Sequence, residues 1–307
     1  MKHFILSLIA IFCSVSAFSQ ANGAATQQFF QLPIVPDSIQ NFQRRCDYML
    51  AHYWDFCDLK KAFSSRDKMA DAFDMYLSFM PYATASEVFS SVDNFFGRIS
   101  RQPKDVEFIA SMAESRLYSD SAEYKSEELY SHFLDNILKI KKISKESRNY
   151  YQAQSRILHN SREGMIAPSF DFVDPEGRKM QFIIDPNQFA TVLMFTSPNS
   201  TAANLARLRL DADIKTSQLI ESGMVKIYQI YVEEPDTTPA TPNGWTTGIA
   251  PGIETVYDVS TIPMFYILNS SGKILKKGPD VDPLLNVMQQ IRIPKKKKDA
   301  PDGNLPE

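Results

Sequence analysis

The spacing of apolar residues changes once along the chain, near residue 161, and this change divides the sequence into two differently built halves. From Asp37 to about Ser161, apolar residues recur at the three- and four-residue spacing of amphipathic helices. After a linker at 161–168, short apolar runs alternate with turn residues, which is typical of strands. The sequence therefore predicts a two-domain α+β protein, with an all-helical domain at 37–161 and an α/β domain at 165–293.

The helical half is predicted to hold six helices, separated by breaks that carry helix stop and start signals. Pro81 and Pro103 stand in two of these breaks. Aromatic residues recur at helical spacing throughout this half, and such residues are usually buried. No repeat of fixed length is evident, which disfavours a helical solenoid. The predicted helices cover residues 42–57, 68–80, 85–100, 105–118, 126–141 and 145–159.

Two cysteines, Cys46 and Cys57, follow one apolar stripe of the first predicted helix. On a continuous helix their positions are about 16 Å apart, at a rise of 1.5 Å per residue. The Cα atoms of a disulfide lie within about 7 Å of each other. We therefore predict that these cysteines do not form a disulfide and that they serve as small apolar residues of the core.

The second half is predicted to begin with a β-hairpin at 167–180, turned at Pro175-Glu176-Gly177. Residues 233–255 are rich in Pro, Thr and Gly and lack periodicity, which predicts an exposed loop. The remaining predicted strands cover 191–196, 225–232, 264–268 and 273–275, and the predicted helices cover 200–222 and 282–291.

Two motifs in this half carry a family resemblance. Residues 191–204 read Thr-Val-Leu-Met-Phe-Thr-Ser-Pro-Asn-Ser-Thr-Ala-Ala-Asn, and residues 260–268 read Ser-Thr-Ile-Pro-Met-Phe-Tyr-Ile-Leu. Together they resemble the thioredoxin fold of secreted envelope thiol-disulfide oxidoreductases, which add an N-terminal hairpin as their peroxiredoxin relatives do. The helical half, with Ala-His-Tyr-Trp-Asp at 51–55, resembles a helical domain of unknown function that precedes such domains.

The resemblance implies a Cys-x-x-Cys motif at the strand-to-helix turn, where this chain has Ser200 and Ala203. A thiolate is the nucleophile in disulfide exchange, and the field of a helix N-terminus lowers the pKa of such a thiol. A serine hydroxyl forms no disulfide, and no nearby histidine activates it as a base. We therefore interpret Ser200 as a helix N-cap, a position that serine favours, and predict no catalytic residue.

The resemblance also implies a groove in which the residue before a cis-proline offers its backbone to an extended chain. We accordingly predict that the Ile262–Pro263 bond is cis. Trp245, within the predicted loop, either lines this groove or fastens the loop to the domain, and the sequence leaves both possibilities open. The predicted groove residues are Pro198, Asn199, Ser200, Trp245, Ile262 and Pro263.

The N-terminus is typical of a secretory signal peptide at 1–19, with an apolar stretch and a small-x-small cleavage pattern before Gln20. We therefore predict a periplasmic or otherwise secreted protein with no integral membrane segment after cleavage. Residues 20–36 are predicted to form a lead-in, and residues 294–307 a disordered basic tail.

Composition narrows the classes of partner. The net charge of −3 gives no indication of nucleic-acid binding, and the four histidines show no metal-ligand spacing, so neither metal nor cofactor is predicted.

Three functions stay open. One is a redox-inactive module that binds a peptide, an envelope protein or a glycan-associated component. The second is a thiol-disulfide oxidoreductase of envelope redox homeostasis that uses Cys46 or Cys57. The third is a scaffold whose helical domain carries the interaction. The missing Cys-x-x-Cys favours a binding or scaffold role, with the oxidoreductase as the alternative.

Overall fold

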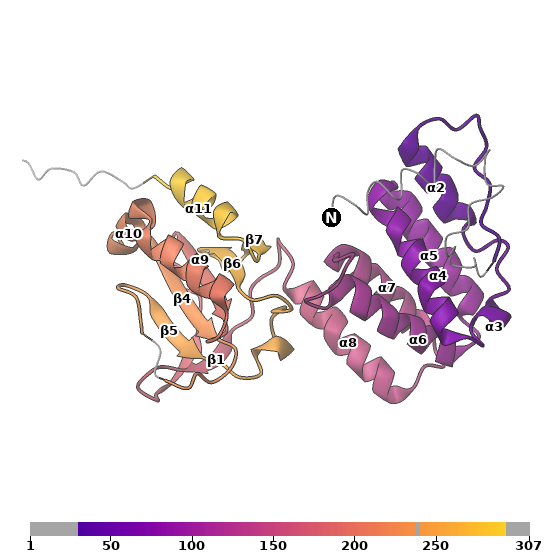
Figure 1. The fold of residues 1–307 in the computed structure, drawn as a ribbon. Coiled ribbons are helices and arrows are strands. Elements are labelled where there is room, and N and C mark those ends of the chain that lie inside the picture. The colour runs from indigo at the N-terminus through magenta and orange to yellow at the C-terminus, as the bar shows by residue number, and fades with distance from the viewer. Residues whose placement is uncertain (1–29, 238–239, 293–307) are drawn as a thin grey trace, which may run out of the picture. The chain divides into compact units, whose positions relative to one another are not determined.

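The computed structural model describes residues 30–237 and 240–292 (Figure 1). The predicted signal peptide, residues 20–29 of the predicted lead-in and the predicted basic tail lie outside the described residues. The chain divides into two compact units, Met1–Ser91 and Val92–Glu307. This division falls inside helix α5 (Ala85–Ile99), so the later helices of the helical half belong to the same unit as the sheet.

The first unit is helical. Its core is rich in aromatic side chains, and two of the buried tyrosines also make hydrogen bonds: the Tyr53 hydroxyl donates to the carbonyl of Ala72 at 2.8 Å. The Tyr76 hydroxyl lies 2.7 Å from that of Ser91, which in turn donates to the carbonyl of Leu50. Besides the start of α5, its elements are α2 (Phe42–His52), α3 (Leu59–Ala62), α4 (Arg66–Phe79) and the 3₁₀ turn η1 (Met80–Tyr82).

The second unit begins with the rest of α5 and three further helices. Helices α7 and α8 each begin at a serine N-cap, because Ser126 and Ser144 accept hydrogen bonds from the backbone N–H groups three residues later. Helix α6 passes directly into a π-helical turn, η2. The bounds are α6 (Pro103–Ala113), η2 (Glu114–Tyr118), α7 (Glu127–Lys139) and α8 (Lys145–Asn160).

A mixed seven-stranded sheet follows, in the order β2-β1-β5-β4-β3-β6-β7. Strand β3 is parallel to β4 and antiparallel to β6, and the central strand β4 is also parallel to β5. The strands are β1 (Phe170–Val173), β2 (Lys179–Phe182), β3 (Ala190–Thr196), β4 (Val225–Tyr231), β5 (Thr246–Ile249), β6 (Met264–Asn269) and β7 (Ile274–Gly278). The predicted organisation, a helical region followed by a mixed sheet, is thereby confirmed.

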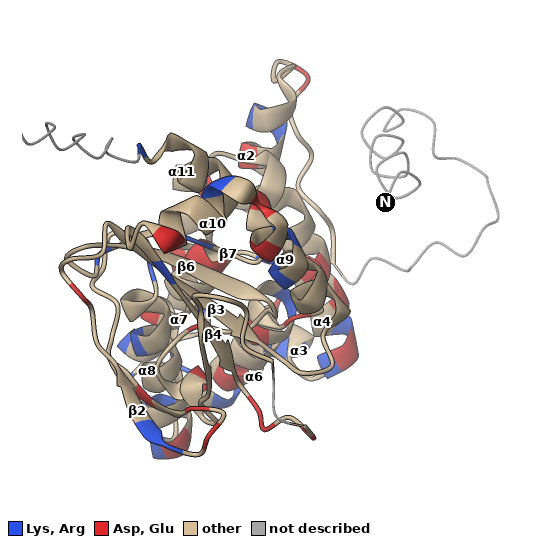
Figure 2. Cartoon of the chain, turned by 90° about the vertical axis from the view of Figure 1, so that its left-hand side faces the viewer, with Lys and Arg blue, Asp and Glu red and all other residues tan. Residues whose placement is uncertain are grey.

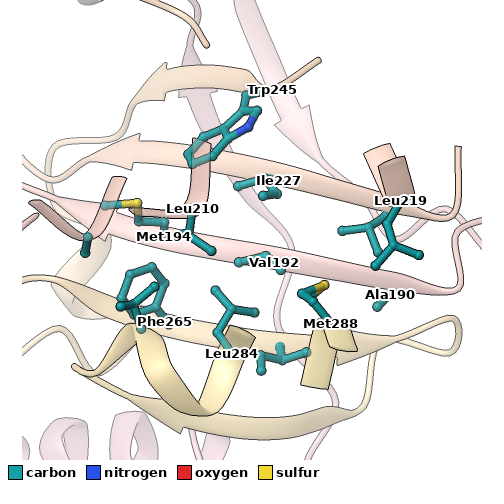
Figure 3. Packing of buried hydrophobic residues seen from close by; sticks show 14 of the residues in the cluster. Ala190, Val192, Met194, Leu210, Leu219, Ile227, Trp245, Phe265, Leu284 and Met288 are labelled. Carbon is teal, nitrogen blue, oxygen red and sulfur yellow. The ribbon is translucent and has the colours of Figure 1, made fainter. Parts of the chain in front are cut away.

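One face of the sheet is covered by the helices α9 (Thr201–Ala212), α10 (Ile214–Glu221) and α11 (Val281–Gln290). Their apolar residues pack on alternate residues of β3, such as Val192 and Met194, as Figure 3 shows. The other face is covered by the β1–β2 hairpin, which bends over the sheet until the ring of Phe170 lies 6.0 Å from that of Phe195.

Two predicted elements differ from the structure. The single helix expected at 200–222 is wrong, because Asp213 has extended backbone angles there and its carboxylate caps α10 by accepting from the N–H of Thr216 at 2.8 Å. The exposed loop expected at 233–255 contains β5 and a 3₁₀ turn, η3 (Ile253–Thr255). Strand β5 was missed because it is only four residues long and contains Gly248, and glycine is depleted in strands.

Candidate functional site

The turn between β3 and α9 stands where a thioredoxin would carry its cysteines. The Ser200 hydroxyl accepts a hydrogen bond from the backbone N–H of Ala203 at 3.1 Å, which confirms the predicted N-cap. Ala203 is only 1% exposed and packs into the core beneath the helix. The sequence contains no cysteine after Cys57, so the second unit has no thiol of its own. The turn is therefore shaped as a helix cap, and it contains no thiol.

The proline loop lies at the same end of the sheet, since the register of β3 and β6 places Phe195 opposite Met264. The Ile262–Pro263 peptide bond is cis, as predicted. Among the described residues, neither the backbone N–H nor the C=O of Ile262 makes a hydrogen bond. The half-buried Ile262 side chain contacts both apolar clusters, one on each face of the sheet. This loop thus presents an unpaired backbone segment on a well-packed support.

Trp245 does not belong to this surface. It is 7% exposed and packs in the cluster beneath α9–α11, together with Ile227 and Leu219, as Figure 3 shows. Gly244 makes this possible, because its φ of +75° favours glycine and a Cβ there would lie 2.5 Å from the Ile220 side chain. Of the two possibilities left open by the sequence, the structure supports fastening of the loop.

The remaining predicted groove residues are brought together at one end of the sheet. Asn199 is exposed, and Pro198, Ser200 and Ile262 are half-buried, whereas Pro263 is buried. The turn is tied to the end of β4 by a hydrogen bond between the side chains of Ser197 and Glu233. Thr196 accepts a backbone hydrogen bond from Val232 at 2.9 Å, which fixes the same junction.

A buried ionic cluster, which the sequence analysis did not predict, anchors the proline loop. The carboxylate of Asp258, 0% exposed, binds the ammonium group of Lys277, which is 7% exposed in β7. Lys277 also donates to Glu127, at the start of α7, at 2.6 Å. Asp258 further accepts from the Tyr118 hydroxyl at 2.9 Å and from the backbone N–H of Ser260 at 3.1 Å. The loop that leads to Pro263 is therefore held from the helical part of its own unit.

Further hydrogen bonds complete this anchor. The backbone N–H of Asp258 donates to the hydroxyl of Ser161 at 2.9 Å, and the backbone C=O of Asp258 accepts from Tyr266 at 2.6 Å. Lys125, just before α7, donates to the side chain of Thr261, one residue before Ile262. A buried charge is tolerated only when it is paired and hydrogen-bonded, and the Asp258 carboxylate meets that requirement through Tyr118, Ser260 and Lys277. Its backbone N–H and C=O are satisfied by Ser161 and Tyr266.

The two carboxylates of this cluster have opposite pKa shifts. Burial would raise the pKa of Asp258, but the charge and the hydrogen bond of Lys277 outweigh it and lower that pKa. Burial raises the pKa of Glu127, which the neighbouring charge of Asp258 also raises while Lys277 opposes the shift. The single ammonium group therefore stabilises the charge of Asp258 more than that of Glu127.

Tyr118 reaches Asp258 from the last residue of the π-helical turn η2. Its ring stacks on that of Tyr130 in α7, with centroids 4.9 Å apart and an interplanar angle of 12°. Burial raises the pKa of the Tyr118 hydroxyl, as does the negative charge of Asp258, so this hydroxyl stays protonated and acts as a donor. π-Helical turns are rare and occur often at functional sites.

Both described cysteines lie in the first unit. Helix α2 ends at His52, so the expectation that one helix carries both cysteines is wrong, and Cys57 follows a turn that closes with its N–H on the carbonyl of Trp54. Cys46 and Cys57 are buried and form no disulfide, as predicted. Burial raises the pKa of the Cys46 thiol to about 11, which keeps it protonated and unreactive at neutral pH.

Within residues 30–237 and 240–292, no three His, Cys, Asp or Glu side chains gather closely enough to hold a metal ion. None of the helices in this described part has both the length and the apolar character needed to cross a membrane.

Comparison with known proteins agrees with the fold. Residues 14–161 match the model of a family described as a domain of unknown function, DUF5106. A thioredoxin-like protein from Bacteroides caccae superposes with a TM-score of 0.64 at 19% identity, covering 85% of this chain and 98% of that one. This likeness shows that the chain has a thioredoxin-like fold, and it extends over the helical region as well. No curated protein matches the chain.

Two further solved structures align with less than half of the chain. One is a conserved protein of unknown function from Bacteroides fragilis, with 23% identity, 42% and 99% coverage of the two chains and a TM-score of 0.38. The other is the thioredoxin domain of a thiol-disulfide oxidoreductase from Bacteroides vulgatus, with 15% identity, 42% and 96% coverage and a TM-score of 0.34.

Proposed function

We propose that this protein is a redox-inactive thioredoxin-like module that binds an extended segment of a partner protein in the cell envelope. The observation that carries the proposal is the combination of a cysteine-free β3–α9 turn with a proline loop whose Ile262 backbone is unpaired. An unpaired N–H and C=O on a fixed loop can pair with the backbone of an extended chain, as in strand addition. No thiol is needed for that interaction.

The binding mode assigns a role to each part of the site. Ile262 pairs with the partner's backbone, and the turn at Pro198–Ser200 forms the facing wall. Asp258 and Lys277 are positioning residues, because they touch the loop rather than the partner. A fixed loop loses little conformational entropy on binding, which favours affinity.

Redox inactivity is tested by an insulin-reduction assay with dithiothreitol. We expect the wild-type protein to reduce no more than the background, and the same for the Cys46→Ser/Cys57→Ser variant. The Ser200→Cys/Ala203→Cys variant is the positive control, because a cysteine pair one turn apart at a helix N-terminus should form a titratable disulfide. Wild-type turnover above background would overturn the proposal and favour an oxidoreductase.

Binding is tested by NMR, with reduced and carboxymethylated ribonuclease as an unfolded chain that has no thiols. We expect the amide resonance of Ile262 to shift on addition of this chain. The amide of Gly272, in the β6–β7 turn, is the control and should not shift. Shifts confined to residues 42–160, with Ile262 unchanged, would instead favour a scaffold whose helical region carries the interaction.

The envelope location forms a separate part of the proposal. It is supported by the signal-peptide features of residues 1–19 and by nothing in the described residues. Fractionation of cells that express the full chain, followed by sequencing of the mature N-terminus, tests it. Export with Gln20 as the first residue is expected, and an uncleaved cytoplasmic chain would contradict it.

A further inference from the structure

The charge of the chain is unevenly distributed. The whole protein has a net charge of −3, yet residues 139–162 contain seven basic residues and one acidic residue, Glu146. Figure 2 marks Lys and Arg in blue, and blue segments occur along α8. The basic residues of this segment, to which His159 adds, are Lys139, Lys141, Lys142, Lys145, Arg148, Arg156 and Arg162.

Several of these residues share one face of α8. Lys145, Arg148, Gln152, Arg156 and His159 follow each other at intervals of three or four residues, which is the spacing of one helical face. The last three of them line a groove between α7 and α8 with a volume of about 340 Å³. This size falls at the lower end of the range for small-ligand sites.

The wall of the groove is rich in hydrogen-bond donors. Ser131 of α7, Ser155 of α8 and Arg162 complete it, and Arg162 donates to the Ser131 hydroxyl across the groove. Asp135 is the single acidic residue in the lining, and it forms no ion pair among the described residues. The groove therefore has a surplus of positive charge.

The basic residues differ in how they are used. Arg148 has a structural role, since its guanidinium donates to the carbonyls of Leu138 and Ile140, at 3.0 and 2.5 Å, and so closes the end of α7. Arg156 and His159 make no hydrogen bond or ion pair with any described residue. Two groups that can donate to an anion thus face a concave polar surface without a protein partner.

We propose that the α7–α8 groove binds an oxyanion of the phosphate or sulfate type, with Arg156 and Arg162 as its principal ligands. A guanidinium group presents parallel N–H donors that match two oxygens of such an anion, and charge-assisted hydrogen bonds of this kind are the strong ones. The serine hydroxyls supply further donors. This site is separate from the proline loop and does not depend on the function proposed for it.

Titration of the full-length protein with inorganic phosphate at constant ionic strength, followed by NMR, tests the site. We expect saturable shifts of amides in α7 and α8, with none for an equal addition of chloride. Arg156→Gln is the main variant, because this side chain has no partner to lose and the fold should be unaffected. Loss of one charge-assisted hydrogen bond should weaken phosphate binding about tenfold.

The matched control is Lys142→Gln, which removes a charge from the same basic segment but lies outside the groove lining. It should change the affinity less than about twofold, because exposed charges are screened. Absence of saturable shifts, or equal weakening by both variants, would overturn the proposal in favour of a diffusely charged face.

Vesicles of phosphatidylcholine with and without phosphatidylglycerol distinguish the source of the anion. Saturable phosphate binding without binding to either kind of vesicle assigns the groove to a free phosphate-bearing ligand. Binding to the anionic vesicles that added phosphate inhibits assigns the groove to a lipid headgroup. Vesicle binding that phosphate does not inhibit, together with no phosphate shifts, would contradict a site in the groove.

Discussion

The two halves of the thioredoxin-like site are held in different ways. The turn before α9 is held by the hydrogen bond from Ala203 to Ser200 at the helix end and by the bonds of Thr196 and Ser197 to the end of β4. The proline loop depends on a buried carboxylate, Asp258, that binds Tyr118 of the π-helical turn and Lys277 of β7, and Lys277 in turn binds Glu127 of α7. The turn is held by its own residues and by the strand next to it, whereas the proline loop is anchored to η2 and α7, which lie far earlier in the sequence. The proline loop therefore depends on distant parts of its own unit for its shape, and the turn does so to a lesser degree.

The largest expected effect concerns Trp245, which belongs neither to the turn before α9 nor to the proline loop. Trp245→Ala should lower the free energy of unfolding by about 3–5 kcal/mol, because it opens a cavity beneath α9–α11. Urea unfolding measures this loss. Trp245→Phe, which keeps an aromatic ring in place, should cost less. If the Trp245→Ala variant were as stable as the wild type, the Trp245 side chain would not be part of the core and would instead belong to the predicted groove.

The next effect tests the anchor of the loop. Asp258→Asn should cost about 3 kcal/mol, because it leaves the buried ammonium of Lys277 without its closest carboxylate. Asp211→Asn, at an exposed position of α9, is the control and should change stability by less than about 0.5 kcal/mol. Similar midpoints for the two variants in urea would show that the loop is not held by this cluster.

A smaller effect is expected in the turn. Ser200→Ala removes the N-cap and should cost about 1 kcal/mol, whereas Ser200→Asp, which can still cap the helix, should cost less. Thermal unfolding of both variants measures the difference. If Ser200→Ala lowered stability as much as Asp258→Asn, the turn before α9 and the proline loop would not differ in the way that the structure indicates.

The smallest effect concerns pH. The pKa of Glu127 is raised in the fold, so its ionisation lowers stability as pH rises through that pKa. The pKa of Asp258 is lowered, so its contribution is present above the unfolded-state pKa and is lost as pH falls through the folded one. Glu127→Gln should therefore change the free energy of unfolding by less than about 1 kcal/mol at pH 7. It should reduce only the loss of stability that occurs as pH rises through the pKa of Glu127. Unfolding followed from pH 3 to pH 8 checks this, and removal of the acid-side loss by Glu127→Gln would contradict the assignment.

The local features of the site could be predicted from the sequence, and the long-range ones could not. Ser200 and the cis bond at Pro263 were predictable because a cap residue and an Ile-Pro pair stand at recognisable points of a resemblance. The cluster of Asp258, Lys277 and Glu127 joins residues 150 and 19 positions apart, and no spacing rule relates them. One sequence signal was available. Lys276 and Lys277 are neighbours in a strand, and successive side chains of a strand point to opposite faces, so one of the two lysines must point toward the interior.

Trp245 shows a second limit. A tryptophan in a Pro- and Gly-rich stretch indicates neither packing nor exposure, because the deciding feature is a four-residue strand that follows it. The break at Asp213 was hidden for a similar reason. Aspartate is tolerated within a helix, and only its backbone angles show that it caps the next helix instead.

The π-helical turn at Glu114–Tyr118 makes the anchor of the proline loop sensitive to the length of the chain. Each residue of an α-helix advances the direction of its side chain by about 100°. Removal of one residue between Ala113 and Tyr118 would restore an ordinary helix and rotate the Tyr118 hydroxyl away from Asp258 by about that angle. Such a deletion would therefore remove one of the hydrogen bonds that anchor the loop, so part of its anchor depends on a single inserted position in a distant helix.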